Sequence, residues 1–507
     1  MHLLAIVLLF TSLLTGLRIS LVSHDTFAFL SAILPQGRVH QWHFYSGVIL
    51  SCVAVFYLLR VKKIRPVRQL LNTKQRYHRF INRIGYLGLT LTLLTGWLHW
   101  LALDLAWFNG NWHYLSVFTI LLYLVLHGYV YWLECGVGIF KRVFPRRLIY
   151  QPVVWLSLSC SFGFALLVYA LVVSPLKTKA LVVQPIPLAT VIDIDGQGNE
   201  ASWQYAPAII IQTHGGANFV NGQTKVEIKA LSNSEEVYFL FRWADPSASL
   251  LHLPLEKTLD GWQVKEHGFY QFNETKFYED KFAVMLSPSC EHGGDGTTHL
   301  GPEPLAGKPK NFHGKGYHAS LDGKPRDLWH WKALRTNDMF LADDNHIGAP
   351  LLAQSGSRRY SAGYFVDSKE SGAYVMNWQW YSPKGITPKR LPKDSNLSLN
   401  LALAASVAPW FDYQPYQASL DSYPVGSVLP SVLYRSNRFE GDRADVRARG
   451  EWLDGFWTLE MVRKREIRSP NDVPLVQGTC MWVSAFDASQ IAHTRHDRPV
   501  QLVFSSL

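Results

Sequence analysis

The 507-residue sequence has few acidic residues in its first third and few cysteines anywhere. Residues 1–175 contain fifteen Lys and Arg against three Asp and Glu, a net charge of +12, whereas residues 176–507 contain thirty-four against thirty-six, a net charge of −2. The basic charge therefore lies on the first part alone. A nucleic-acid-binding surface would need this charge on a soluble domain, so we expect no nucleic-acid partner.

Motifs that mark several enzyme classes are absent. The sequence has no Gly-x-Ser-x-Gly, no His-Glu-x-x-His and no phosphate-binding loop, which argues against a hydrolase. The five cysteines do not have the close spacing of a zinc site. Cys290 and Cys480 fall in the second part, where an oxidising compartment would allow them to pair, but the sequence does not show that they are neighbours.

Long apolar runs occur before Pro175 and none of comparable length occurs after it. The runs cover residues 3–17, 44–59, 84–103, 114–133 and 153–173. Most are near the length needed to cross a bilayer, so residues 1–175 are predicted to form a membrane bundle of about five helices. The first run is alternatively a cleaved signal peptide; its lack of a basic leading region and of a clear cleavage site favours a retained helix.

The basic residues of the first part indicate how the bundle is oriented. They concentrate in the connection between the second and third runs and in that between the fourth and fifth, and such connections stay in the cytoplasm. We therefore predict a multi-pass protein of the bacterial inner membrane with a cytoplasmic N-terminus. Residues 176–507 are predicted to lie in the periplasm.

The second part has the pattern of an all-β domain. Short stretches rich in Val, Tyr, Phe and Trp alternate with Gly, Pro, Asn and Asp, as in KVEIKALSNSEEVYFLFRWAD, where a polar turn at residues 232–236 separates two strands. GFWTLEMVRKREI and TCMWVSAFDAS are further strands near the end. We predict a β-sandwich over residues 176–507.

Histidines are frequent in the predicted membrane helices, where polar side chains usually mark function. His113 and His127 are fourteen residues apart, which advances a helix by about 21 Å and returns to nearly the same face. Neutral imidazole is a common axial haem ligand, so one helix could hold two haems. By depth we pair His43 with His113 and His78 with His127. His99 is the alternative partner of His113, and a proton relay or an interfacial role remains open.

The membrane part resembles a known family at two segments. RYHRFINRIGYLGLTLTLLTGW and WHYLSVFTILLYLVLHGY are similar to two helices of the di-haem membrane cytochrome b subunits of formate dehydrogenases and nickel-iron hydrogenases. This resemblance implies that His78, His113 and His127 ligate two b haems and that the bundle exchanges electrons with quinone. The chain departs from that family in having one or two extra helices before the matching part.

The second part resembles the haem-binding domain of the ethylbenzene dehydrogenase gamma subunit family. The matching phrases include VYFLFRWAD, YEDKFAVMLS, DLWHWKALRTND and MWVSAFDAS. The family implies a β-sandwich with one b haem held by a Met and a Lys, and Met285 matches that Met. The family's C-terminal Lys has no counterpart, although Arg498 lies near its place. Cys290-Glu291-His292 does not complete a Cys-x-x-Cys-His motif for covalent haem.

A substitute for the missing Lys is sought between residues 290 and 346, which contain six histidines: His292, His299, His313, His318, His330 and His346. His292 is the leading candidate because it closely follows Met285 in a Gly-rich loop. His299 and Lys332 come next.

Together these patterns predict a multi-haem b-type cytochrome, with two haems in the bundle and one in the exported domain. It would carry electrons between quinone or quinol and a periplasmic redox protein or molybdoenzyme-type complex, as a component of a respiratory oxidoreductase. One alternative is a membrane-anchored ligand-binding or sensor module. Another is a quinol-linked reductase that acts at an open exported haem.

Overall fold

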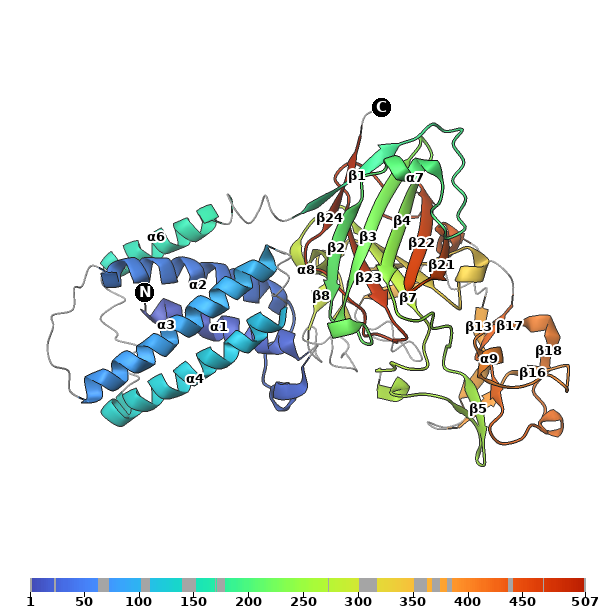
Figure 1. Cartoon of the computed structure of the whole chain (residues 1–507), viewed down its shortest axis with the longest axis horizontal. Coiled ribbons are helices and arrows are strands. Elements are labelled where there is room, and N and C mark those ends of the chain that lie inside the picture. Colours follow the sequence, from blue (N-terminus) through green and yellow to red (C-terminus); the bar gives the residue numbers. More distant parts are fainter. Residues whose placement is uncertain are drawn as a thin grey trace. The chain divides into compact units, whose positions relative to one another are not determined.

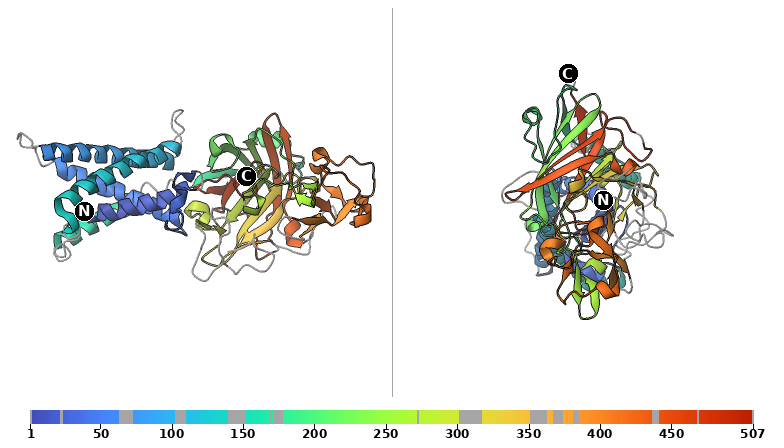
Figure 2. Two further views of the ribbon diagram at one scale, coloured as in Figure 1. Left: turned by 90° about the horizontal axis from the view of Figure 1, so that it is seen from below. Right: turned by 90° about the vertical axis from the view of Figure 1, so that its right-hand side faces the viewer.

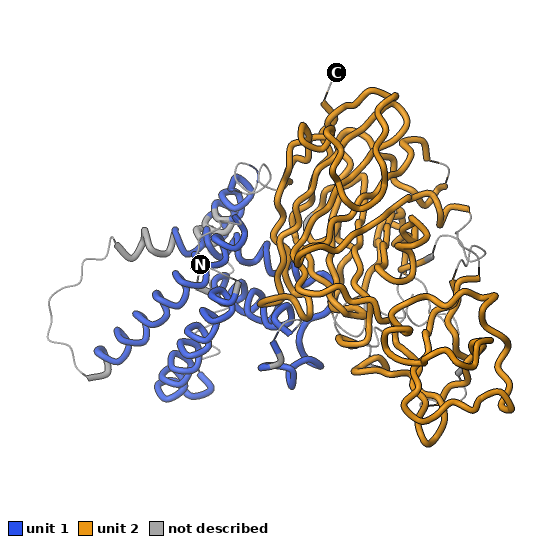
Figure 3. The backbone as a smooth tube through the Cα atoms, turned by 45° about the vertical axis from the view of Figure 1, so that its right-hand side comes forward, with its two compact units in different colours: residues 1–177 blue, residues 178–507 orange. Residues whose placement is uncertain are grey.

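The computed structural model of the chain divides into two compact units, residues 1–177 and residues 178–507 (Figure 3). It describes residues 2–21, 24–62, 73–101, 110–138, 152–168, 170, 178–271, 273–300, 317–350, 363–366, 374–380, 385–435, 441–467 and 469–505. Unit 1 is helical and unit 2 is mostly β (Figure 1).

The described part of unit 1 contains five long helices: α1 (His2–Ser20), α2 (Val39–Lys62), α3 (Thr73–Trp100), α4 (Gly110–Cys135) and α6 (Pro152–Val168). Short 3-10 turns, η1 (Asp25–Leu30) and η2 (Gly136–Gly138), lie after α1 and α4. The helices pack as two hairpins, α1 along α2 and α3 along α4. Side chains of α1 and α2, among them the buried Leu8, Leu50 and Val53, also contact Leu89 and Leu93 of α3.

Two helices of the described part are long and apolar enough to cross a membrane, Leu3–Ser20 and Asn111–Gly138. The first lies near the N-terminus, where a signal sequence passes the same test. Helix α3 is not apolar enough to count as a span, because Thr, Gly, Trp and His interrupt its apolar half and basic residues occur in its first turns. Helix α6 has 17 described residues. By length and composition the structure therefore supports two spans rather than the five predicted.

Unit 2 is built on one twelve-stranded sheet of order β12-β11-β10-β7-β23-β24-β1-β3-β4-β22-β21, with β2 paired to β3. The strands are β1 (Lys179–Pro185), β2 (Ile209–His214), β3 (Gln223–Ser232), β4 (Glu236–Ala244), β7 (Lys281–Ser287), β10 (Arg326–Lys332), β11 (Asp343–Ile347), β12 (Tyr364–Val366), β21 (Arg447–Leu453), β22 (Phe456–Lys464), β23 (Cys480–Phe486) and β24 (Val500–Phe504). The predicted mostly β domain, including the β3–β4 hairpin, is confirmed.

The sheet encloses its own core because its strands alternate apolar and polar residues. Phe241 of β4 lies 4.8 Å from Phe282 of β7 between ring centroids, and Trp331 of β10 lies 5.0 Å from Trp457 of β22. In the sheet order, β4 and β7 are far apart. The two halves of the sheet therefore face each other across one core. Figure 2 shows the strands of unit 2 from two further sides.

A second, smaller core packs outside the main sheet and was not predicted. It joins β5 (Leu255–Thr258) and β6 (Gly261–Val264) to a group of very short strands: β13 (Tyr374–Met376), β14 (Trp378–Trp380), β15 (Ile386–Pro388), β16 (Arg390–Pro392), β17 (Ala408–Pro409), β18 (Tyr413–Pro415), β19 (Val428–Leu429) and β20 (Val432–Tyr434). The remaining named strands and helices are β8 (Thr298–His299), β9 (Tyr317–His318), α7 (Ala201–Tyr205), α8 (His292–Asp295) and α9 (Leu401–Ala404). The described part of unit 2 also contains six 3-10 turns: Val220–Gly222, Phe269–Gln271, Asn337–Met339, Trp410–Asp412, Ala418–Leu420 and Gly441–Ala444.

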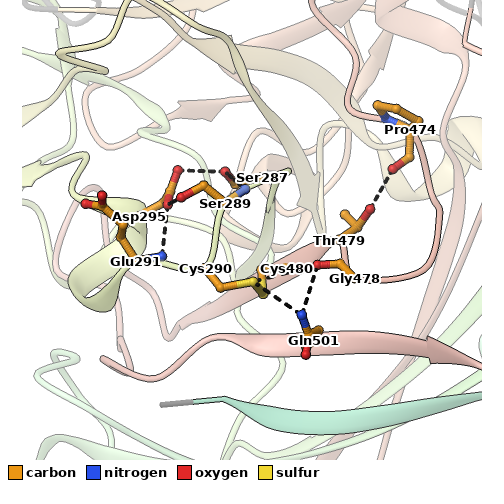
Figure 4. The surroundings of a disulfide bond; sticks show 10 residues. All are labelled: Ser287, Ser289, Cys290, Glu291, Asp295, Pro474, Gly478, Thr479, Cys480 and Gln501. Carbon is orange, nitrogen blue, oxygen red and sulfur yellow. Dashed lines mark hydrogen bonds between the residues drawn. A yellow bond between two sulfur atoms is a disulfide. The ribbon is translucent and has the colours of Figure 1, made fainter. Parts of the chain in front are cut away.

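Cys290 and Cys480 form a disulfide that ties the loop after β7 to the start of β23 (Figure 4). Asp295 organises this loop: it accepts hydrogen bonds from Ser287 Oγ at 2.6 Å and from the backbone N–H of Glu291 at 3.0 Å. The disulfide thus fixes a Gly-rich loop against the sheet.

Removing this disulfide is expected to destabilise unit 2. The bond closes a loop of 190 residues, and loss of such a bond costs about 2–5 kcal/mol of unfolding free energy. The Cys290→Ser, Cys480→Ser double variant should therefore unfold at lower denaturant concentration than the parent, as followed by tryptophan fluorescence. Cys160→Ser, which changes a free, exposed cysteine, is the control; equal midpoints for all three proteins would contradict the prediction.

Candidate functional site

Two imidazole rings from different helix hairpins face each other inside unit 1. His43 lies in the second turn of α2 and His113 in the first turn of α4. Their ring centroids are 6.0 Å apart, with 71° between the ring planes. The structure therefore brings together two residues that the sequence analysis paired.

A threonine of the neighbouring helix holds each ring through the same nitrogen. Thr15 Oγ1 lies 3.1 Å from His43 Nδ1, and Thr95 Oγ1 lies 3.1 Å from His113 Nδ1. Both hydroxyls donate to a carbonyl one turn earlier, that of Thr11 at 2.6 Å and that of Leu91 at 2.7 Å. Each hydroxyl therefore accepts from Nδ1–H, which leaves Nε2 as the nitrogen with the lone pair that binds metal.

A glycine of the neighbouring helix lies against each imidazole ring, where a larger residue would not fit. A Cβ atom on Gly16 would lie 2.8 Å from His43 Cε1, and one on Gly96 would lie 3.1 Å from His113 Cε1. Contacts this short would displace the imidazoles. Each helix hairpin therefore supplies one histidine, one threonine and one glycine.

The two hairpins repeat a sequence pattern that the sequence analysis missed. Residues 12–16 read SLLTG and residues 92–96 read TLLTG, while residues 42–46 read WHFYS and residues 112–116 read WHYLS. The repeat extends to contacts, since Ser46 Oγ donates to the His43 carbonyl and Ser116 Oγ to the His113 carbonyl. The shared LLTG and WH phrases were the available signal for Thr15, Gly16, Thr95 and Gly96.

The other predicted histidines of unit 1 have different surroundings. His78 Nε2 lies 2.7 Å from Glu134 Oε1. The Tyr131 ring contacts both His78, at 5.4 Å, and His127, at 4.8 Å between centroids. The predicted pair His78 and His127 is thus linked through Tyr131. His99 lies in the last turn of α3 with its side chain exposed.

Met285 points away from the main core of unit 2 and is covered by the Gly-rich loop. It lies in β7 and packs with Cys480, Trp482 and Ile347. Thr297 Oγ1 lies 3.8 Å from its sulfur. The side chain of His292, at the start of α8, lies outside the described part of the structure.

His299 and Lys332 are both engaged with neighbouring groups. His299 Nε2 lies 3.1 Å from the Ala319 carbonyl, and its ring stacks on Tyr317 at 4.9 Å. Lys332 Nζ pairs with Asp343. These contacts would have to break before either side chain could bind a metal.

His330 is a half-buried histidine, with a buried Nε2, that the sequence analysis did not select. Trp329 and Trp331 point into the main core, so His330 points to the opposite face of β10, which it shares with Met285 through the β7–β10 register. Within the described part of the chain its buried Nε2 has no hydrogen-bond partner. Burial, with smaller contributions from Lys332 and Lys281, holds the pKa of His330 well below its ordinary value, so the imidazole is neutral.

Basic side chains surround His330 on this face. Lys281, Lys332 and Arg335 all act on its pKa. Lys332 pairs with Asp343 and Arg335 with Glu279, whereas Lys281 directs its ammonium to the Gln490 carbonyl. A face with a neutral metal-binding nitrogen and an excess of cations suits an iron macrocycle that carries carboxylates.

Comparisons with known proteins show what the chain is similar to. Among solved structures, the chain is similar to a family 9 carbohydrate-binding module from Caldicellulosiruptor kristjanssonii, solved with glucose, at 8% identity and a TM-score of 0.26 over 65% of this chain and 97% of that one. It is also similar to a putative carbohydrate-binding protein from Bacteroides uniformis, at 9% identity and a TM-score of 0.25 over 64% and 99%. No curated protein matches. The model of the family described as ethylbenzene dehydrogenase matches residues 200–498, and the chain belongs to that family.

Proposed function

We propose that the chain is a membrane-bound b-type cytochrome that transfers electrons between the quinone pool and a periplasmic partner. The observation that carries this proposal is the facing pair His43 and His113, each held through Nδ1 so that Nε2 is the metal-binding nitrogen. Catalytic chemistry would then belong to the partner protein.

The distribution of side chains in unit 1 supports a location in lipid. Its polar groups, such as Ser12 and Ser46, whose hydroxyls lie 2.7 Å apart, meet between helices. Its outer surface carries large apolar side chains, among them Leu87, Leu94, Leu115, Leu122, Val125 and Leu133. This arrangement is typical of membrane bundles. We propose that unit 1 lies in the membrane, with the N-terminus in the cytoplasm and unit 2 in the periplasm, where its disulfide would persist.

The geometry of the facing pair fits a haem. Metal–nitrogen bonds to imidazole are about 2 Å long, and each ring centre lies roughly 1 Å beyond its nitrogen, so an iron between two imidazoles separates the centroids by about 6 Å. The observed separation is 6.0 Å. When bound, haem supplies one-electron transfer. The chain's own contribution is to orient two neutral imidazoles and, through Thr15 and Thr95, to set how strongly they donate to iron.

His78 and His127 are the proposed ligands of a second haem in the bundle. Tyr131 contacts both rings and Glu134 binds His78, so occupation of this site requires these two side chains to move. The site at His43 and His113 does not involve these side chains, so the first bundle haem is proposed to bind whether or not the second is present.

The third haem is proposed for unit 2, held by His330 from the outer face of β10. The unpartnered, buried Nε2 and the excess of basic side chains around it support this placement. Met285 is the ligand that family resemblance favours. Because His330 and Met285 stand on neighbouring strands of the same face, offset by two residues, the sheet would not place them on opposite sides of one macrocycle. His292, His299 and Lys332 remain proposed as residues that would hold this haem together with His330.

Membership of the ethylbenzene dehydrogenase family supports a redox role for unit 2. The proposed periplasmic partner is a redox protein or a molybdoenzyme-type complex that exchanges electrons with the unit 2 haem.

The quinone link is tested on the full chain in detergent by following its b-haem absorption. A water-soluble quinol is added to the oxidised protein, and in a separate experiment the corresponding quinone is added to the reduced protein. Reduction by quinol and reoxidation by quinone are expected; bound haem that responds to neither would contradict the quinone link.

Gly16→Ala is expected to lower haem binding in unit 1. The new methyl group would lie 2.8 Å from His43 Cε1 and displace the imidazole ring. Disturbing the residues that orient a metal ligand typically costs 10–100-fold in affinity, so we expect haem affinity to fall by about tenfold or more. Haem absorbance per chain measures the effect. Gly47→Ala in α2, whose added Cβ meets nothing within 4 Å, is the matched control, and haem contents that agree between the two variants would refute the steric argument.

A further inference from the structure

Three aspartates from distant parts of unit 2 converge at one end of its main core. Asp245 follows β4, Asp280 precedes β7 and Asp487 follows β23. One carboxylate oxygen of each lies within 4.8 Å of the others. All three side chains are nearly inaccessible to solvent, with exposures of 0%, 0% and 4%.

Hydrogen bonds satisfy these carboxylates unequally, since Asp245 Oδ1 accepts one from the Ser247 backbone N–H at 3.2 Å. Asp280 accepts from the backbone N–H groups of Ser249 and Ala488 and from Trp457 Nε1 at 3.1 Å. In contrast, Asp245 Oδ2 is fully buried and has no hydrogen-bond partner within the described residues. The Asp487 carboxylate likewise makes no hydrogen bond or ion pair there. The buried, unpartnered Oδ2 of Asp245 thus adjoins two further carboxylates.

Positive side chains do not compensate this cluster. Within the described part of the chain, no Lys, Arg or His forms an ion pair with any of the three aspartates. Lys281, next to Asp280 in the sequence, instead directs its ammonium to the Gln490 carbonyl at 2.9 Å. Burial of three uncompensated carboxylates is costly, so the cluster needs either bound protons or a cation.

We propose that Asp245, Asp280 and Asp487 bind a calcium ion that joins the two halves of the sheet. The donors are all carboxylate oxygens, which are the ligands of hard cations. Ca²⁺ suits them because that ion accepts six to eight oxygens in flexible geometry. Mg²⁺ demands a nearly regular octahedron and gives up its water reluctantly. The site is separate from the proposed haem sites and does not depend on them.

The competing state is a cluster neutralised by protons. Burial, followed by the charges of Asp280 and Asp487, raises the pKa of Asp245 to about 9. A protonated Asp245 would not respond to calcium, and its replacement by asparagine would leave the fold at least as stable as before.

The test uses the full chain in detergent, stripped with EGTA and then titrated with CaCl₂ while the Tm of unit 2 is followed by tryptophan fluorescence. A saturating ion should raise Tm by about 5 °C, reversed by EGTA, with a smaller rise for Mg²⁺. Asp245→Asn should abolish the rise, whereas Asp338→Asn, at an exposed aspartate paired with Arg449, should keep it. A parent Tm that ignores calcium, or an equal rise in Asp245→Asn, would overturn the proposal.

A second readout does not require any variant to fold. Tb³⁺ occupies calcium sites and emits when a neighbouring indole is excited, and Trp457 donates directly to Asp280. The stripped parent protein should therefore show Tb³⁺ emission that Ca²⁺ displaces with the same midpoint as the Tm titration. Absence of sensitised emission would count against the site.

Discussion

Replacing His113 by alanine is expected to remove one b haem per chain from the full-length protein. His113 Nε2 is the proposed iron ligand contributed by α4, and alanine offers no substitute donor. His43→Ala should give the same loss, because the centroids of the two imidazoles lie only 6.0 Å apart. Pyridine haemochrome quantification, normalised to chain concentration, measures the result.

His99→Ala distinguishes this pairing from the alternative in which His99 is the partner of His113. The His99 side chain is exposed in the last turn of α3, so its removal should leave the haem content unchanged. Loss of haem in His99→Ala together with retention in His43→Ala would reverse the assignment. Equal haem in all three variants would show that this site binds none.

Replacing His330 by alanine is expected to remove a different haem, that of unit 2. Its Nε2 is buried without a hydrogen-bond partner in the described part of the chain, so alanine leaves no unsatisfied partner behind and the fold should persist. The measurement is haem content in the His113→Ala background, where the bundle contribution is reduced. The double variant should bind one haem fewer than His113→Ala alone.

Met285→Leu is the matched comparison for His330→Ala. Leucine fills nearly the same volume, and such exchanges usually cost less than about 1.5 kcal/mol, so packing with Trp482 and Ile347 should survive. We expect Met285→Leu to retain the unit 2 haem. If the haem is lost in Met285→Leu and retained in His330→Ala, the family's methionine is the ligand and the assignment to His330 is wrong.

The sequence was informative where its pattern has a short period. Alternation in the segment from Lys225 to Asp245 predicted β3 and β4, and charge separated the basic helical part from the rest. His43 and His113 were paired because helix depth can be estimated from apolar length alone. The Thr-Gly pairs of α1 and α3 are repeated in the sequence. Only the structure shows that each threonine contacts the histidine of the helix packed beside it.

The unit 2 site was harder to predict because it depends on register between strands far apart in the sequence. His330 sits between two tryptophans, and only the placement of both indoles in the core shows that the imidazole faces the other way. The pairing of Cys290 with Cys480 likewise could be predicted only by knowing that β7 and β23 are neighbouring strands. The three aspartates converge from loops that no local pattern connects. The second core of short strands has too little periodicity to predict.

The most direct test of an electron-transfer role is the reduced-minus-oxidised spectrum of the purified full chain, with haem counted as pyridine haemochrome. The His43–His113 pair of unit 1 and the His330 imidazole of unit 2 predict at least two b haems per chain. A protein that is folded, as judged by its tryptophan fluorescence and intact disulfide, yet contains no haem after expression with ample haem supply would contradict the account.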